Sequence, residues 1–210
     1  AWDGRVQAAG VDPYRYPPTA PELAGLRDGW LFPAGVPRLN HPTEPTIYPP
    51  AAQAYFRTVD KLAPTGARHK PWQVAAAVLA VATTAALAAL LWRRGGDPRR
   101  AVLWAWCPTV ILEAGNNGHV DVLAALLVTA GLGTLAATAG RGRAAPTVAG
   151  AVIGGTLLGA ATAVKLLPAL ALAALSPRRY LVALAAAAGV VCLLYLPHVL
   201  AVGTEVLGFL

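Results

Sequence analysis

Three ionisable side chains lie close together in an otherwise apolar part of the sequence. Glu113, His119 and Asp121 flank the run Gly-Asn-Asn-Gly at residues 115–118, with long apolar stretches on both sides. A charged carboxylate at the centre of a membrane helix costs about 2.5–3.5 kcal/mol, so such groups usually mark a site or a pathway. A plain hairpin turn would need only the Asn-Gly residues. We therefore interpret the three side chains as candidate ligands of a polar substrate.

A single lysine forms a second candidate. Lys165 is the only lysine after Lys70, and it precedes Pro168 by three residues in an otherwise uncharged stretch. Its ammonium group could extend to a membrane interface, as long cationic side chains often do. It could instead bind an anion at a broken helix, and a lipid phosphate is the anion expected at that depth.

The first 71 residues contain a third group, in which acids, arginines and aromatic residues alternate with prolines. The segments VDPYRYPP and NHPTEPTIYPP are rich in turn-forming residues. Carbohydrate and phosphate sites use this mixture of side chains, although a solvated loop contains it too. The candidates are Asp3, Arg5, Asp12, Tyr14, Arg15, Tyr48 and Gln53.

The composition indicates that membrane helices position these groups. Of the 210 residues, 56% are hydrophobic and 13% are charged, whereas a soluble domain has about 25% charged residues. The net charge of +7 does not indicate nucleic-acid binding, because most basic residues after position 70 fall in three short clusters. Such clusters are typical of cytoplasmic loops. They are Arg93, Arg94, Arg99 and Arg100, then Arg141 and Arg143, then Arg178 and Arg179.

The apolar runs divide residues 72–210 into about six membrane segments. Residues 72–92 are uncharged and lie between two tryptophans, as one transmembrane helix requires. Residues 101–140 would measure about 60 Å as a helix, twice the thickness of a bilayer core, which predicts a hairpin. The expected segments are 72–92, 101–114, 119–140, 145–164, 166–176 and 180–197.

This topology predicts an all-α integral membrane protein whose polar turns meet on one side. With the basic clusters inside, residues 1–71 form a large outer loop, and the turns near 115–118 and 164–168 face it. Within that loop, the apolar spacing of Pro50–Leu62 predicts a short interfacial helix. The pairs Gly150 and Gly154, and Gly155 and Gly159, predict close helix packing.

Several other types of site have no support in the sequence. Cys107 and Cys192 lie far apart without a CxxC pattern, so we expect two buried thiols rather than a disulfide or a zinc site. Soluble hydrolase, NTPase and zincin chemistry are not indicated, because GxSxG, P-loop and HExxH motifs do not occur.

The order and spacing of four segments resemble a known family. The segments are WDGRVQAAGVDPYRY, TIYPPAAQ, PTVILEAGNNGHVDVL and VKLLP. Together they resemble the bacterial GT-C type membrane glycosyltransferases, in particular family 87 and the polyprenyl-phosphate-mannose-dependent mannosyltransferases, over essentially the whole chain. The resemblance implies a GT-C-like transmembrane bundle in the bacterial cytoplasmic (inner) membrane, with the large loop in the periplasm. It also implies transfer of a sugar, with mannose favoured, from a polyprenyl-phosphate donor to a glycan or glycolipid acceptor on the outer face.

The resemblance assigns a role to each candidate residue. It implies an acidic general base in the first outer loop, and Asp3 is the nearest acid. The family's acidic motif follows a first membrane helix, so we expect the chain to begin inside that loop, and a base before Ala1 is the alternative. Donor binding is assigned to Glu113, His119, Asp121 and Lys165, and positioning of the loop and substrate to Arg5, Tyr14, Arg15, Tyr48 and Gln53. Neither a cofactor nor a metal is implied.

Two other functions compete with this hypothesis. A transporter or flippase could use the broken segment at Lys165 as its midplane site, but no internal repeat is visible, and the long Pro-, Tyr- and Trp-rich loop favours an enzyme. A non-catalytic scaffold would leave Glu113, Asp121 and Lys165 without a function, although such groups are costly in apolar surroundings.

Overall fold

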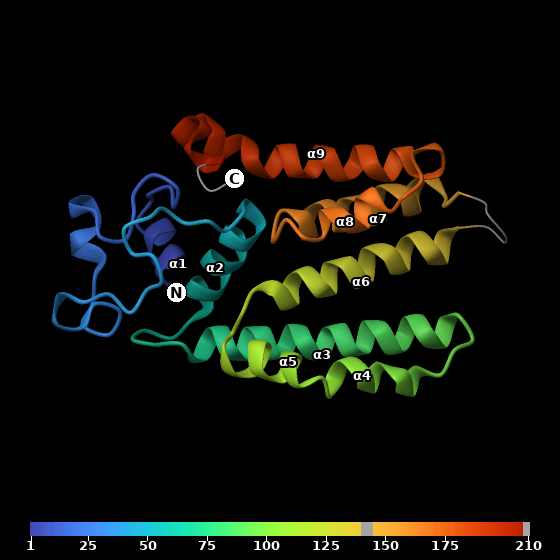
Figure 1. Ribbon diagram of the computed structural model, residues 1–210, viewed down its shortest axis with the longest axis horizontal. Coiled ribbons are helices and arrows are strands. Elements are labelled where there is room, and N and C mark those ends of the chain that lie inside the picture. The colour runs from blue at the N-terminus through green and yellow to red at the C-terminus, as the bar shows by residue number, and fades with distance from the viewer. Residues whose placement is uncertain (140–144, 208–210) are drawn as a thin grey trace.

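The protein is an all-α membrane protein in which long helices form a bundle and the N-terminal residues form a lobe at one end (Figure 1). The computed structural model describes residues 1–139 and 145–207. Three of the described helices are long and apolar enough to cross a membrane, over Lys70–Arg93, Asp121–Thr138 and Tyr180–Val206. The principal helices are α3 (Lys70–Arg93), α6 (Asp121–Thr138), α7 (Val148–Thr162) and α9 (Pro177–Val202).

The helices of the bundle lie in a row, and each packs against the next. In Figure 1 the order is α3, α6, α7 and α9, and the contacts between these pairs are the most extensive in the bundle. α7 has 15 residues and would span about 22 Å, which is less than a bilayer core of about 30 Å. It packs between two longer helices, α6 and α9.

The expected continuous segment 101–114 is instead a broken chain of short helices beside α3. It comprises η3 (Pro98–Ala101), α4 (Val102–Ala105), α5 (Pro108–Val110) and the π-helix η4 (Ile111–Asn116). Pro108 causes the break, because proline lacks an N–H and disfavours helical backbone in the residue before it. Cys107 accordingly has an extended ψ of 121°. The Trp104 indole N–H donates to the Ala80 carbonyl at 3.2 Å and attaches the broken segment to α3.

The expected return helix 166–176 also differs from the structure. α7 ends at Thr162, the chain turns through residues 163–168, and the helix that follows, α8 (Ala169–Ala173), has five residues. The last helix, α9, extends beyond the expected range 180–197 at both ends. The expectation of two buried thiols is wrong, because Cys107 is half-buried and Cys192 is exposed.

Four glycines of α7 allow its neighbours to approach closely, which confirms the packing expected from their spacing. A Cβ at Gly150 or Gly154 would collide with side chains of α6. On the other face, a Cβ at Gly155 would lie 2.1 Å from the Ala183 carbonyl oxygen of α9, and one at Gly159 would lie 2.5 Å from that of Ala187. The two glycine pairs therefore fix α7 between α6 and α9.

The polar turns of the bundle gather at one end, which we call the loop end. It comprises the lobe, residues 1–69, and the turns 111–121 and 163–168 (Figure 1). The opposite end carries the exposed residues Arg94, Arg99 and Arg100. The expected basic residues Arg141 and Arg143 lie outside the described residues, and residues 178–179 belong to the first turn of α9.

The lobe has a small core of its own. It contains α1 (Trp2–Ala8), η1 (Pro21–Leu26), η2 (Pro33–Gly35) and α2 (Pro50–Leu62). The buried core side chains are Trp2, Val6, Leu23, Leu31 and Phe32. α1 crosses α2 closely at Gly4, where a Cβ would lie 2.6 Å from the Phe56 carbonyl oxygen. The lobe is therefore a folded unit rather than an extended loop.

We expect Gly155→Ala to destabilise the protein, because the added methyl group would overlap the backbone of α9. Overpacking of this kind costs about 1–3 kcal/mol. The matched control is Gly189→Ala on α9, where a Cβ would meet no atom within 4 Å. Thermal unfolding of the purified protein measures both variants, and a wild-type midpoint for Gly155→Ala would contradict the close α7–α9 contact.

Candidate functional site

An ion pair joins two turns of the loop end that are 44 residues apart. The Lys165 Nζ lies 2.9 Å from Asp121 Oδ1 and donates to Oδ2 at 3.2 Å. Asp121 begins α6, and Lys165 lies in the turn that follows α7, so the pair connects the ends of two packed helices. Both side chains are close to half exposed, at 47% and 46%. A ligand can therefore reach the ammonium group.

The Gly-Asn-Asn-Gly turn extends this pair into a polar cluster. His119 lies between two carboxylates, with Nδ1 3.7 Å from Asp121 Oδ2 and Nε2 3.5 Å from Glu113 Oε2. Asn117 donates to the same Glu113 oxygen at 3.2 Å. The structure thus brings together the four expected donor ligands Glu113, His119, Asp121 and Lys165, which we call the donor cluster.

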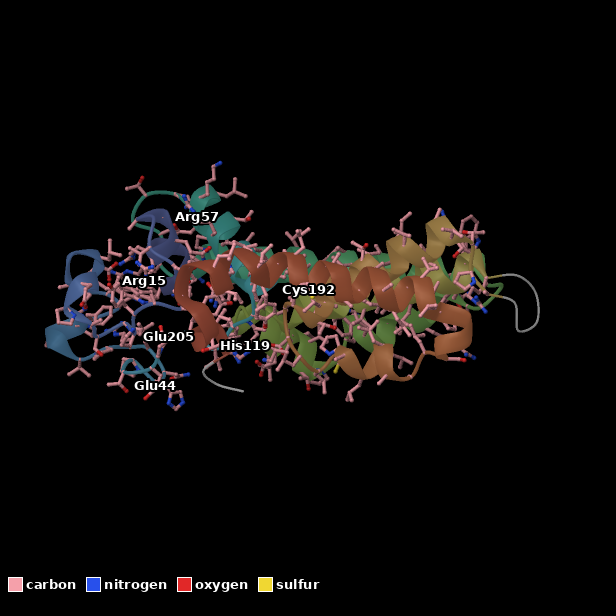
Figure 2. All side chains as sticks on the ribbon, turned by 90° about the horizontal axis from the view of Figure 1, so that it is seen from above. Arg15, Glu44, Arg57, His119, Cys192 and Glu205 are labelled. Atoms are coloured by element: carbon pink, nitrogen blue, oxygen red, sulfur yellow. The ribbon has the colours of Figure 1, made fainter. Side chains whose placement is uncertain are left out.

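Backbone geometry explains the sequence of this turn. Glu113 belongs to a π-helix, a form that is rare and frequent at functional sites. Gly118 has φ of +63°, and a Cβ there would lie 3.2 Å from the Gln73 nitrogen at the start of α3. Glycine tolerates both the left-handed conformation and the close approach. Figure 2 places His119 where the lobe meets the bundle.

Asp3 is held by two neutral side chains in the lobe. Its Oδ2 accepts hydrogen bonds from the Thr46 hydroxyl at 2.6 Å and the Gln53 amide at 2.9 Å. Gln53 is 1% exposed, and its Oε1 accepts a hydrogen bond from Gln7 at 2.9 Å. The buried glutamine thus fixes the orientation of the Asp3 carboxylate, and it does so from α2, which is 50 residues away in sequence.

Two tyrosines of the lobe are joined by a hydrogen bond. Tyr14 is buried, and its hydroxyl donates to the Tyr48 carbonyl at 2.7 Å. Burial raises the pKa of both tyrosines above the usual range. The pKa of Tyr48 is also lowered by the Lys165 charge and raised by the charges of Asp3 and Asp121.

α2 fastens the lobe to the bundle at the donor cluster. The Ala51 N–H donates to the Ala163 carbonyl at 2.9 Å, two residues before Lys165. Ala52 packs with Val120 and Val164 in one buried cluster, to which Tyr48 also contributes. The positions of Asp3, Asp121 and Lys165 are consequently determined by one packed junction.

The two candidate arginines, Arg5 and Arg15, bind other parts of the protein and lie away from the junction of α2 with the bundle. Arg5 forms an ion pair with Asp28 at 2.7 Å and donates to the Leu26 carbonyl. The Leu31 N–H and Arg5 lower the pKa of Asp28. Arg15 donates to the Ala201 carbonyl at the end of α9, at 3.0 Å. Both guanidinium groups bind atoms of the protein itself.

Sequence reasoning missed a second link between the lobe and α9. His198 Nδ1 lies 2.8 Å from Asp12 Oδ2, and both side chains are largely buried. The His198 ring also packs edge-to-face against Tyr14, with centroids 5.0 Å apart. The sequence feature that could have indicated this link is His198 itself, a histidine that follows Pro197 inside the last apolar run.

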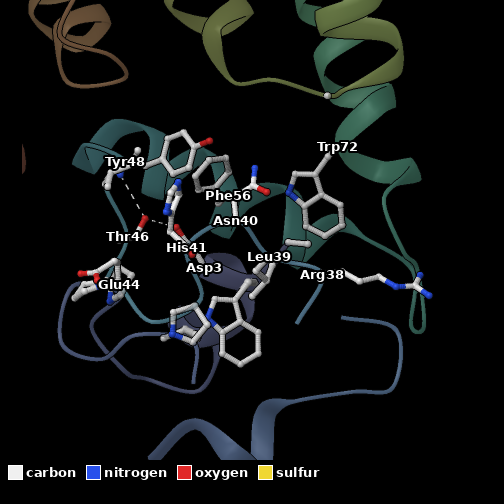
Figure 3. Close-up of a pocket in the computed structure, with 18 of the residues that line it drawn as sticks. Asp3, Arg38, Leu39, Asn40, His41, Glu44, Thr46, Tyr48, Phe56 and Trp72 are labelled. Carbon is white, nitrogen blue, oxygen red and sulfur yellow. Dashed lines mark hydrogen bonds between the residues drawn. The ribbon is translucent and has the colours of Figure 1, made fainter. Parts of the chain in front are cut away.

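A cavity of about 620 Å³ lies beside Asp3 (Figure 3). Its lining includes Asp3, Asn40, Tyr48, Trp72, Asn117 and Gly118. Asn117 and Gly118 belong to the turn that carries the donor cluster, so the cavity extends from the lobe to that turn. Sequence reasoning treated Trp72 only as an interfacial anchor. Within the described ranges, no group of three His, Cys, Asp or Glu side chains could hold a metal ion.

The comparisons with known proteins give one family. The sequence model of glycosyltransferase family 87 matches residues 47–209, which contain α2, the donor cluster and the whole described bundle. No match was found among the curated proteins or among the solved structures.

We expect Gln53→Leu to loosen the lobe, because it removes the two side-chain hydrogen bonds through which the buried Gln53 links Gln7 to the Asp3 carboxylate. A hydrogen bond to a charged group contributes about 1.5–3 kcal/mol. Limited proteolysis should cut residues 1–69 several-fold faster. Gln73→Leu is the control, since its amide binds an exposed carbonyl outside the lobe. Equal cleavage rates in the two variants would contradict the role of Gln53.

Proposed function

Because this chain belongs to glycosyltransferase family 87, we propose that it moves a sugar from a polyprenyl-phosphate carrier to a glycan or glycolipid acceptor. The resemblance of its motifs favours mannose as the sugar. Membership of a transferase family makes a transporter or flippase the less favoured alternative. The reaction takes place on the outer face of the bacterial cytoplasmic membrane, at the loop end of the bundle.

The exposed arginines support this orientation. Arg94, Arg99 and Arg100 lie at the end of the bundle opposite the lobe. Arginines in short loops favour the cytoplasmic side. The lobe and the donor cluster then lie on the outer side, where the apolar helices meet the polar lobe. A lipid-linked donor can reach this boundary with its chain in the bilayer and its phosphate at the cluster.

The observation that carries the proposal is the Asp121–Lys165 pair. An ammonium group is the simplest partner for the phosphodiester of the donor, and Lys165 is the only lysine after Lys70. When the sugar leaves, the carrier gains one negative charge on its phosphate. Lys165 stabilises this developing charge, and Asp121 holds the ammonium in position through both carboxylate oxygens.

Asp3 acts as the general base of the transfer. The hydroxyl oxygen of the acceptor attacks the anomeric carbon of the sugar, and its proton passes to the Asp3 carboxylate. The bond between the anomeric carbon and the phosphate oxygen breaks, and its electron pair remains on the polyprenyl phosphate. The proton then passes from Asp3 to water. Thr46 and Gln53, which both donate to Oδ2, orient the carboxylate for this step.

Lys165→Ala should reduce sugar transfer about 10²–10³-fold, which is the usual loss when one charge-stabilising group is removed. The assay follows radiolabelled sugar from a polyprenyl-phosphate donor into the glycan fraction of membranes that contain the full-length protein. Lys61→Ala is the matched control, because Lys61 is exposed on α2 outside the cluster. Wild-type transfer by Lys165→Ala, at equal protein level, would reject the assignment.

Asp3→Asn should lower kcat about 10²–10⁴-fold, the usual contribution of a general base, with little change in the KM of the donor. Asp97→Asn is the control, since Asp97 caps η3 at the opposite end of the bundle. A variant that retains full kcat would exclude Asp3 as the base.

A further inference from the structure

We propose that the 620 Å³ cavity is the acceptor-saccharide site and that the Trp72 indole N–H binds a hydroxyl group of the acceptor. This inference rests on the proposed function, because it assigns the second substrate of the same reaction. It also assigns a role to a residue that neither the proposed catalysis nor donor binding uses.

The position of the cavity separates the two substrates. The acceptor hydroxyl must lie beside the base, and Asp3 is in the cavity wall. The lining also contains Asn117 and Gly118, from the turn that carries the donor cluster. Lys165 is not part of the lining. A molecule in the cavity would therefore lie between the base and the donor sugar without occupying the phosphate position.

The lining suits an uncharged saccharide. Its aromatic rings include Trp2, Trp30 and Trp72, which can cover the C–H face of a sugar ring. Asn40 and Glu44 offer hydrogen-bonding groups. Charges of both signs are present, so the cavity does not select an anion. A volume of about 620 Å³ lies within the usual range of small-molecule sites, about 300–1,000 Å³.

Trp72 is the residue that points to a ligand. Its side chain is 9% exposed, and its buried Nε1 has no hydrogen-bond partner among the described residues. Buried N–H groups are nearly always paired, and the indole of Trp104 and the hydroxyl of Tyr14 both have protein partners. In Figure 3 the Trp72 ring stands on the side of the cavity away from Thr46 and Tyr48. A saccharide oxygen would supply the missing acceptor.

The test measures binding of soluble sugars to the full-length protein in lipid nanodiscs by calorimetry, without a donor. The probes are three neutral disaccharides, of mannose, glucose and galactose. Trp72→Phe keeps an aromatic ring but removes the N–H, and loss of one hydrogen bond should raise Kd about tenfold for the disaccharide that binds best. Trp92→Phe is the matched control, because Trp92 is exposed at the other end of the same helix.

Asn40→Ala serves as a second variant, since Asn40 is an exposed residue of the cavity wall whose loss is not expected to disturb folding. It should weaken binding several-fold. The inference is overturned if the wild type binds none of the disaccharides, if both cavity variants bind like the wild type, or if Trp92→Phe weakens binding equally. Binding is measured without a donor and therefore does not depend on catalysis. Disaccharide binding together with no transfer in the separate polyprenyl-phosphate assay would refute the proposed function and leave the cavity intact as a saccharide site.

Discussion

The buried junction of Ala52, Val120 and Val164 is the contact on which the loop end depends. It joins α2 of the lobe to the turn before α6 and to the turn after α7, and it thereby places Asp121 and Lys165 within 2.9 Å of each other. The glycines of α7 contribute to this arrangement, because they allow α6 and α9 each to pack closely against α7. Helix packing in the bundle thereby determines the geometry of charged groups at its surface.

The proximity of the four side chains of the donor cluster was predictable, because ionisable residues within apolar stretches of sequence indicate a site. The lengths of the apolar runs and the positions of the basic clusters together placed the turns near Asp121 and Lys165 on the same side of the membrane. The break at Cys107 was predictable in principle from Pro108, but the length of the apolar run suggested a continuous helix. Hydropathy indicates whether a segment lies in the membrane, but it does not indicate whether the backbone of that segment can remain helical.

The lobe could not be predicted in the same way. Several of its hydrogen bonds join residues that are 21 to 50 positions apart in the chain, as for Arg5 with Leu26 and Asp3 with Gln53. No periodic pattern in the sequence indicates such contacts. Arg5 and Trp72 illustrate the consequence. An arginine in a loop appears available for a ligand but is bound to Asp28, whereas a tryptophan that appears to be an interfacial anchor lines the cavity.

The exposure of the Asp121–Lys165 pair is compatible with the phosphate binding that we propose for it. A buried ion pair would resist any change of partner, because removing one charge leaves the other unsatisfied. A pair that is close to half exposed contributes only about 0–1 kcal/mol to stability, so a phosphate can share the ammonium at little cost. The packing of Ala52, Val120 and Val164 remains in place during such an exchange. Helix packing thus keeps the site assembled independently of the ion pair, as the proposed binding of a phosphate by Lys165 requires.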